Sequence, residues 1–156
     1  GSDAYDSFLS IAASGDTART ATALEALQQE YKDTVYASLA VLELARQQAE
    51  AGELDAAKAT LEAAKGGKID ASLVPLIDLR LARLLMAQEQ YDAALAQLGR
   101  VGGGDAFAAE IASLRGQIAY RQGRRDEARA ALEEAQEKGA TDEIIKYLLT
   151  ELQEQT

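Results

Sequence analysis

Apolar and small residues recur along this chain at helical spacing, and one phrase of them occurs three times, at residues 44–58, 81–95 and 115–129. In each copy a second small residue follows the first by twelve positions, and a leucine follows four later: Ala45/Ala57/Leu61, Ala82/Ala94/Leu98 and Gly116/Ala128/Leu132. No stretch alternates apolar and polar residues as a half-buried strand would. The pattern therefore predicts an all-α chain of repeated helix pairs.

The spacing of the copies, 37 and then 34 positions, matches a helix–turn–helix unit of about 34 residues, the length of the tetratricopeptide repeat (TPR). Two antiparallel helices can approach closely only where both present small side chains, and the paired small residues suit that crossing. Gly52 and Gly123 suit the left-handed position that ends a first helix, with Glu89 as the exception.

The fold predicted from these repeats is a TPR-like α-solenoid with a right-handed superhelix, about four helix pairs and a carboxyl-terminal capping helix. Gly1-Ser2 is expected to be a cloning scar, and residues 3–156 are expected to form one domain. The repeats are expected at 34–66, 71–100 and 105–138, after a degenerate pair at 4–31 and before a cap helix at 141–154. The expected helices span 4–14, 17–31, 34–51, 54–66, 71–88, 91–100, 105–122, 125–138 and 142–153.

Local signals set the expected helix starts. Thr34, Asp70 and Asp105 are residue types that cap helix amino termini. Pro75 is expected in the first turn of its helix, where its missing N–H costs little. The glycine stretches 66–67 and 102–104 are expected to be turns between repeats, because neither matches the pattern of a phosphate-binding loop.

Charge and composition exclude several classes of function. The net charge of -10 and the pI near 4.5 make nucleic acid an unfavourable partner. The chain has no cysteine and no histidine, so the usual zinc sites, thiolate chemistry and imidazole-based triads are excluded. We therefore predict no enzyme activity, no catalytic residue, no metal and no cofactor.

The first helices of stacked pairs line the concave face of such a superhelix, and the register of the small residues predicts which side chains lie there. A groove of leucine and methionine flanked by arginine suits an extended or helical apolar peptide. The alternative is that the leucines are core residues, covered by the amino-terminal pair or the cap helix. The candidate partner-binding groove comprises Leu39, Leu42, Arg46, Leu76, Leu79, Arg83, Met86, Gln117, Tyr120 and Arg121.

Residues 121–129 form the one basic cluster of the chain. Its arginines could pair with Asp126, Glu127 and Glu133 on neighbouring turns. Alternatively, they could form a dock for an acidic segment of a partner.

Three stretches together resemble a known family: residues 36–45, residues 79–83 followed by 91–95, and residues 109–116 followed by Gly123 and 127–129. They are similar to the periplasmic TPR domain of YfgM-type proteins, which are ancillary subunits of the bacterial SecYEG translocon. The likeness covers residues 4 to about 150. It implies a preceding membrane-spanning helix and a location at the periplasmic face of the bacterial inner membrane.

The resemblance also implies partners: the SecYEG translocon, the prolyl isomerase PpiD and unfolded exported proteins on their way to periplasmic chaperones. It carries no catalytic motif. The predicted function is a non-catalytic protein-binding scaffold that acts as a chaperone-like accessory of the translocon. The alternative is a structural assembly adaptor that joins folded partners through its outer surface.

Overall fold

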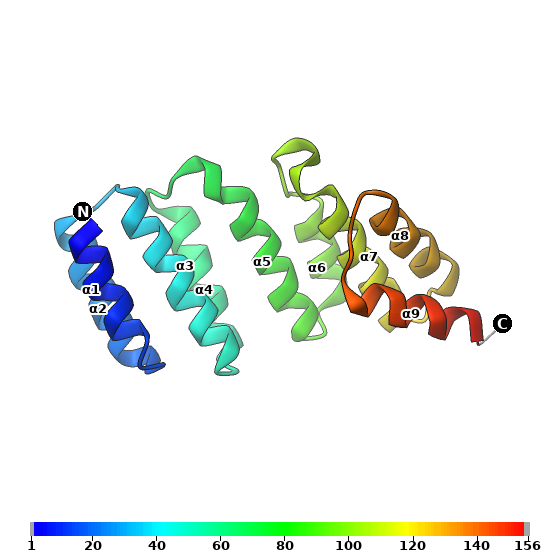
Figure 1. Ribbon diagram of the computed structural model, residues 1–156, viewed down its shortest axis with the longest axis horizontal. Coiled ribbons are helices and arrows are strands. Elements are labelled where there is room, and N and C mark those ends of the chain that lie inside the picture. The colour runs from blue at the N-terminus through cyan, green and yellow to red at the C-terminus, as the bar shows by residue number, and fades with distance from the viewer. Residues whose placement is uncertain (1, 155–156) are drawn as a thin grey trace. The chain divides into compact units, whose positions relative to one another are not determined.

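The computed structural model describes residues 2–154, and that part of the chain is helical with no strand (Figure 1). The α-helices are α1 Ser2–Ala12, α2 Thr17–Glu30, α3 Val35–Glu50, α4 Leu54–Gly66, α5 Val74–Ala87, α6 Tyr91–Leu98, α7 Ala108–Arg121, α8 Arg125–Glu137 and α9 Glu143–Glu154. Two 3₁₀ helices, η1 Ala71–Leu73 and η2 Gly104–Phe107, precede α5 and α7. The all-α repeat fold predicted from the spacing is confirmed, and the helix boundaries agree to within a few residues.

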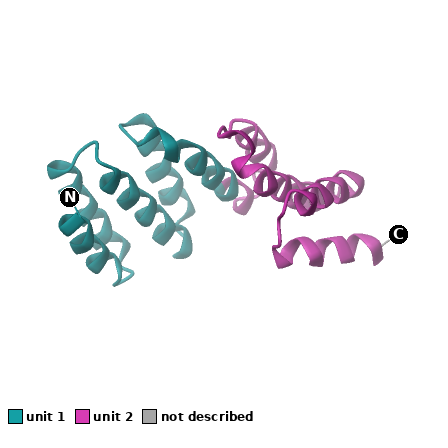
Figure 2. Cartoon of the chain, turned by 45° about the horizontal axis from the view of Figure 1, so that its top comes forward, with its two compact units in different colours: residues 1–84 teal, residues 85–156 magenta. Residues whose placement is uncertain are grey.

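The chain divides into two compact units, Gly1–Leu84 and Leu85–Thr156, and the boundary lies near the end of α5 (Figure 2). Unit 1 therefore contains α1 to α4 and most of α5. Unit 2 contains α6 to α9 and the last turn of α5. Each unit has its own buried apolar side chains.

The core of unit 1 is organised on two sides of α3. Val41 and Leu44 pack with Phe8 of α1 and Leu24 of α2. Leu42 and Ala45 instead pack with residues of α4 and α5, among them Leu61, Ile77 and Leu81. A helix that is apolar on two faces is buried between neighbours rather than left at a surface, and α3 accordingly forms the centre of this unit.

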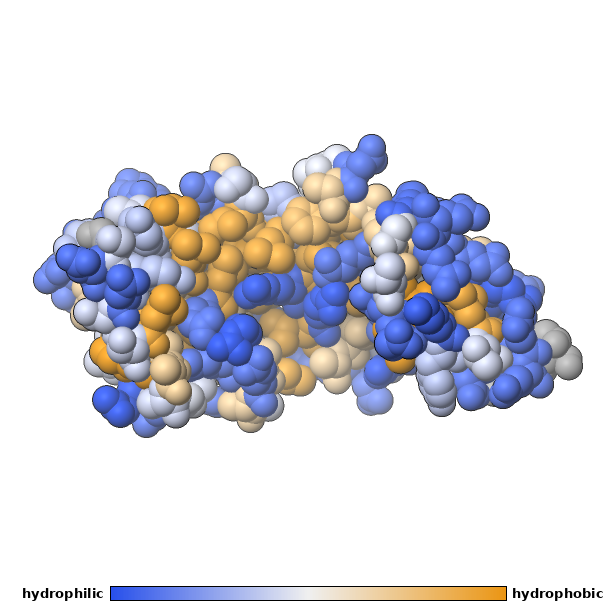
Figure 3. Space-filling view, in the orientation of Figure 1, coloured by the Kyte–Doolittle hydropathy of each residue, from blue (hydrophilic) through white to orange (hydrophobic). Residues whose placement is uncertain are grey.

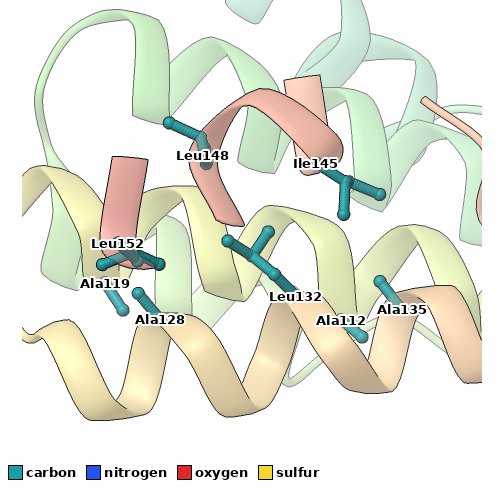
Figure 4. Packing of buried hydrophobic residues seen from close by; sticks show 8 residues of the cluster. All are labelled: Ala112, Ala119, Ala128, Leu132, Ala135, Ile145, Leu148 and Leu152. Carbon is teal, nitrogen blue, oxygen red and sulfur yellow. The ribbon is translucent and has the colours of Figure 1, made fainter. Parts of the chain in front are cut away.

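The core of unit 2 is built where α9 packs against α7 and α8 (Figure 4). Ile145, Leu148 and Leu152 supply the apolar face of α9, as expected of an amphipathic capping helix. They meet Leu132 of α8 and a set of buried alanines on the two partner helices: Ala112, Ala119, Ala128 and Ala135.

The turns inside the repeats share one conformation. Gly52 and Gly123 have φ of +81° and +77°, as predicted, and Glu89 takes the same left-handed region with φ of +61°. In each turn the next amide donates to a carbonyl five residues earlier, as in the Schellman motif: Glu53 N to Gln48 O (2.8 Å), Gln90 N to Leu85 O (2.9 Å) and Arg124 N to Ala119 O (2.9 Å). Glu89 therefore adopts the same turn conformation as the two glycines, although its residue type differs.

The predicted helix starts were partly right. Thr34 caps α3 by accepting a hydrogen bond from Ala37 N at 3.2 Å, and Pro75 lies in the first turn of α5. Asp70 caps η1 rather than α5, through Ser72 N at 2.9 Å. The prediction for Asp105 was wrong: this residue lies inside η2, and Phe107 precedes α7. A 3₁₀ turn between the glycines and α7 moves the helix start beyond Asp105.

Candidate functional site

In unit 1, the predicted groove residues lie on α3 and α5, and the structure separates them into core and surface. Leu42 and Leu79 are 6% and 0% exposed, so they contribute to the core. Leu39 and Leu76 are half-buried, and Arg46 and Arg83 are exposed. Two of the four leucines are therefore core residues, although Leu42 is buried by α4 and α5 rather than by the amino-terminal pair or the cap helix. The other two are only half-buried.

Hydrogen bonds hold α5 and the segment before it alongside α3. Arg80 Nη1 donates to the Leu42 carbonyl at 3.2 Å, and Asp70 N donates to Ser38 Oγ at 3.1 Å. Leu39 lies about one helical turn before Leu42, which packs with residues of α5, and Leu76 lies one helical turn before Arg80, so both leucines belong to the seam between these helices. Figure 3 shows hydrophobic residues gathered over α3 and α5 on the visible face. This face, carrying Leu39 and Leu76, is called the α3–α5 face below.

The charge on Arg46 of this face is already matched within its own helix. Its guanidinium binds Glu43 (Nε to Oε2, 3.1 Å) and Glu50 (Nη1 to Oε1, 2.7 Å). These hydrogen bonds, first to Glu43 and then to Glu50, raise the arginine pKa above its usual range. Because two carboxylates surround one cation, Arg46 gives this face no net attraction for an acidic partner. Apolar contact is what the α3–α5 face offers.

Unit 2 holds the remaining predicted groove residues. Met86 and Gln117 are half-buried, Arg121 is exposed, and Gln117 Nε2 donates to Ser113 Oγ at 3.1 Å. Tyr120 is half-buried because it packs against the apolar cluster that α9 shares with α7 and α8. The capping helix thus covers part of the α7 surface in this unit, at a tyrosine rather than at the leucines that the core alternative concerned. Partner binding by the ten residues stays a prediction.

Sequence reasoning missed a hollow on the other side of α3. It has a volume of about 1040 Å³ and lies among α2, α3 and α4. Its apolar lining includes Val41 and Leu44, and Gln28 and Lys68 are among its polar lining residues. At 100° per residue, Val41 and Leu44 lie on the face of α3 opposite Arg46. The spacing of Ala37, Val41 and Leu44 along α3 is the signal that could have indicated a second apolar face.

The basic cluster has a role that neither sequence interpretation anticipated. Arg125 Nη2 and Arg129 Nη2 donate to the main-chain carbonyl of Leu152, at 2.8 and 3.2 Å. This carbonyl lies in the last turn of α9, where main-chain acceptors have no partner within the helix. Arg124 follows the expected local pairing, through an ion pair with Glu127. Arg125 and Arg129 therefore hold α9 on α8.

Buried polar contacts also tie elements of unit 1 together. Lys65 Nζ of α4 lies 2.6 Å from Asp78 Oδ1 of α5, whose side chain is only 6% exposed. Gln47 of α3 donates to the Ala12 carbonyl at the end of α1. These contacts fix helices against one another and show no arrangement for chemistry.

No group of three or more acidic side chains in residues 2–154 lies close enough together to hold a metal ion. Among the same residues, no helix has both the length and the apolar character needed to cross a membrane.

Comparison with known proteins agrees with this geometry. A solved structure of a MamA double mutant (MamA RS-1 ArsTM) superposes with a TM-score of 0.72 over 98% of this chain and 85% of that one, at 15% sequence identity. At that identity the likeness concerns the fold alone. A search of curated proteins found no match.

The family described as "Tetratricopeptide repeat-like domain" matches residues 1–154. Domains of this kind are typically non-catalytic and bind proteins or peptides. This chain belongs to the tetratricopeptide repeat-like domain family.

Proposed function

We propose that this chain is a protein-binding scaffold and that the α3–α5 face of unit 1 holds apolar segments of its partners. The observation that carries the proposal is the pair of accessible leucines, Leu39 and Leu76, on two joined helices beside an arginine that its own helix neutralises. An apolar strip whose Arg46 is matched by carboxylates of its own helix favours hydrophobic side chains and tolerates different sequences. Those are the properties needed to hold unfolded segments.

The resemblance to YfgM-type proteins supports a specific setting. In this proposal the chain works at the periplasmic face of the bacterial inner membrane, anchored by a helix that precedes it. It receives exported, unfolded proteins beside the SecYEG translocon and passes them to periplasmic chaperones, in contact with PpiD. The family match and the apolar α3–α5 face are both compatible with this role.

The test is a pull-down with the purified chain, using the periplasmic part of PpiD and an unfolded secretory segment as baits. We expect capture of both, and a loss of segment capture in Leu39→Asp. Leu9→Asp is the matched control, because Leu9 is an exposed leucine (37%) of α1 in the same unit. If the folded chain captures neither bait, the proposal is wrong.

The hollow among α2, α3 and α4 favours a second candidate, an adaptor that joins folded partners through its outer surface. It lies across α3 from the Leu39 side, so the two functions use separate surfaces. Ala63 is exposed and lines the hollow. Ala63→Trp should therefore fill the hollow and block an adaptor partner, while capture of unfolded segments persists. Loss of partner binding in Ala63→Trp, together with unchanged partner binding in Leu39→Asp, would favour the adaptor.

A further inference from the structure

Helix α3 presents an aromatic, an aliphatic and an acidic side chain along one line. At 100° per residue, Tyr36, Leu39 and Glu43 fall within about 60° of one another around the helix. All three are half-buried, so each still exposes part of its surface. Because Leu39 belongs to the α3–α5 face, Tyr36 and Glu43 extend that face along α3.

An aromatic ring of α1 adjoins this line. The ring centroid of Tyr5 lies 5.6 Å from that of Tyr36, with the two planes tilted by 39°. The Tyr5 ring also stacks on Phe8, which is buried in the core of unit 1, with centroids 6.2 Å apart. Tyr5 itself is only half-buried. Because α1 and α3 lie side by side (Figure 1), the two tyrosines form an aromatic wall that bridges both helices.

Carboxylates from both helices act on this aromatic wall. Helix α1 carries Asp3 and Asp6 and has no basic residue. On α3, a single arginine is shared by two carboxylates, Glu43 and Glu50. Burial, followed by the charges of Glu43 and Asp6, raises the pKa of the Tyr5 phenol. A negative potential that disfavours a phenolate at this position favours a cation there.

The arginines of the third helix on this side of unit 1 lie at the opposite edge of the face. Arg80 of α5 donates to the Leu42 carbonyl at 3.2 Å, and Arg83 of α5 is exposed. Helix α5 packs on one side of α3, and α1 packs on the other. The α3–α5 face is therefore bordered by an acidic, aromatic edge at α1 and by a basic edge at α5.

Tyrosine rings beside carboxylates suit a guanidinium group. The ring faces attract cations, and arginine stacks on them while its N–H groups still donate to carboxylates. An exposed ion pair is weak by itself, but an apolar side chain of the same segment can contact Leu39. Packed helices lie about 8–10 Å apart, and an extended chain rises about 3.3 Å per residue. A segment that crosses α1 and α3 therefore places its cationic and apolar side chains about three residues apart.

We propose that Tyr5, Asp6, Tyr36 and Glu43 form a subsite for a cationic side chain, and that the unfolded segments held by the α3–α5 face carry an arginine about three residues from a large apolar side chain. These four residues are called the cation subsite below. The inference rests on the proposed function, because it states which apolar segments the same face selects. Lysine fills the subsite less well, because its compact, strongly hydrated ammonium does not stack on a ring as guanidinium does.

The test compares the binding of short fluorescent peptides to the full chain, measured by anisotropy. The first peptide contains Arg-Ser-Gly-Leu-Ser-Leu between Gly-Ser flanks, and the second has glutamine in place of arginine. We expect the arginine peptide to bind at least about threefold more tightly at low ionic strength. The ratio should fall in about 1 M salt, where the Debye length is about 3 Å. A third peptide, with the arginine about eight residues from the first leucine, keeps the same charge and should bind like the glutamine peptide.

Variants of the aromatic wall locate the preference for arginine. Tyr36→Leu removes a ring but keeps an apolar side chain, so it should lose most of the preference while it binds the glutamine peptide as before. Tyr36→Phe keeps a ring and should retain the preference.

Variants of α1 test the carboxylates. Asp6→Asn should lower the ratio of the two affinities. Asp3→Asn is the matched control: it removes the same charge from the same helix, but at 100° per residue Asp3 lies nearly opposite Tyr5 around α1. Because Asp6 is exposed, Asp6→Asn decides the question even where Tyr36→Leu destabilises the fold.

Three outcomes overturn the inference. One is equal binding of the arginine and glutamine peptides to the unaltered chain. Another is a preference that persists unchanged in both Tyr36→Leu and Asp6→Asn while circular dichroism shows folded proteins, because the cation is then bound elsewhere. The third is a dimer of the unaltered chain that Tyr36→Leu dissociates, because a second copy then occupies the subsite.

The result is separable from the test of the proposed function. Leu39→Asp, measured with the glutamine peptide, reports on capture by the α3–α5 face, whereas the ratio of the two affinities reports on the cation subsite. Equal binding of both peptides, with a loss in Leu39→Asp, rejects the subsite and leaves the proposed function standing. Binding of neither peptide rejects both.

Discussion

Gly116 of α7 lies directly against Leu132 of α8: a methyl group added at Gly116 would come within 2.6 Å of Leu132 Cγ and 3.1 Å of Leu132 N. The side chain of Leu132 is fully buried beneath α9 and has little space to move away. The third repeat has glycine where the first two have alanine, and in the third repeat an alanine at this position would clash with Leu132.

Gly116→Ala should destabilise unit 2. Overpacking costs about 1–3 kcal/mol, and the better helix propensity of alanine offsets about 1 kcal/mol of that cost. The free energy of unfolding measured with urea should reveal the net loss. Combining the change with Leu132→Ala should give less than the sum of the two single losses, because the smaller residue at 132 removes the clash. Additive losses would show that the two residues are not in conflict.

Lys65 should be more costly to lose than its partner Asp78. The side chain of Asp78 is 6% exposed, so a change at Lys65 leaves its carboxylate buried without this cation. Lys65 is 34% exposed, so its ammonium can turn to solvent when Asp78 is removed. Lys65→Met retains most of the aliphatic packing of the lysine, and its loss of unfolding free energy should exceed the roughly 1–3 kcal/mol expected for Asp78→Ala. Denaturant titration of both variants compares them, and a larger loss in Asp78→Ala would contradict this ranking.

Glu89→Gly should stabilise the chain. Glu89 holds φ of +61°, a conformation that costs non-glycine residues about 1–3 kcal/mol. Glycine removes that strain but gains freedom in the unfolded chain, so the expected net gain is about 0.5–1 kcal/mol. Thermal unfolding should show a higher Tm. Gly123→Ala, at φ of +77° with open space around it, is the opposite control and should lower Tm.

Stability should fall at alkaline pH because of Tyr5. Burial, followed by the charges of Glu43 and Asp6, raises the pKa of Tyr5 above its ordinary value of 10.0. A group with a raised folded-state pKa stabilises the fold below its unfolded pKa, and that contribution disappears as pH rises through the folded pKa. Tm measured from pH 8 to 11 should therefore decline less in Tyr5→Phe, which retains the ring contacts with Phe8 and Tyr36 (centroids at 6.2 and 5.6 Å). A parallel decline in both proteins would contradict this assignment.

Local sequence was sufficient for most of the fold. Helix number and approximate boundaries follow from short-range periodicity, and each turn residue is set by the register of its own repeat. Even Glu89, which lacks the chemistry of a helix-ending glycine, could be placed in the left-handed position from its alignment with Gly52 and Gly123. The start of α7 was missed at Asp105 because a 3₁₀ turn that contains this residue, Gly104–Phe107, precedes the α-helix.

The candidate sites depended more on long-range contacts. Helical phase placed Leu39 and Leu42 on one side of α3, but which of them is covered depends on the position of α5. The contact of Arg125 and Arg129 with Leu152 joins residues 27 and 23 positions apart, beyond any helical period. The hollow among α2, α3 and α4 exists only because three helices pack around it.

The repeat spacing and its small residues were enough to determine helices and their pairing, since these depend on neighbours within about a repeat length. Which side chains are buried, which hold another helix and which face a partner was decided only by packing between helices that the periodicity does not specify.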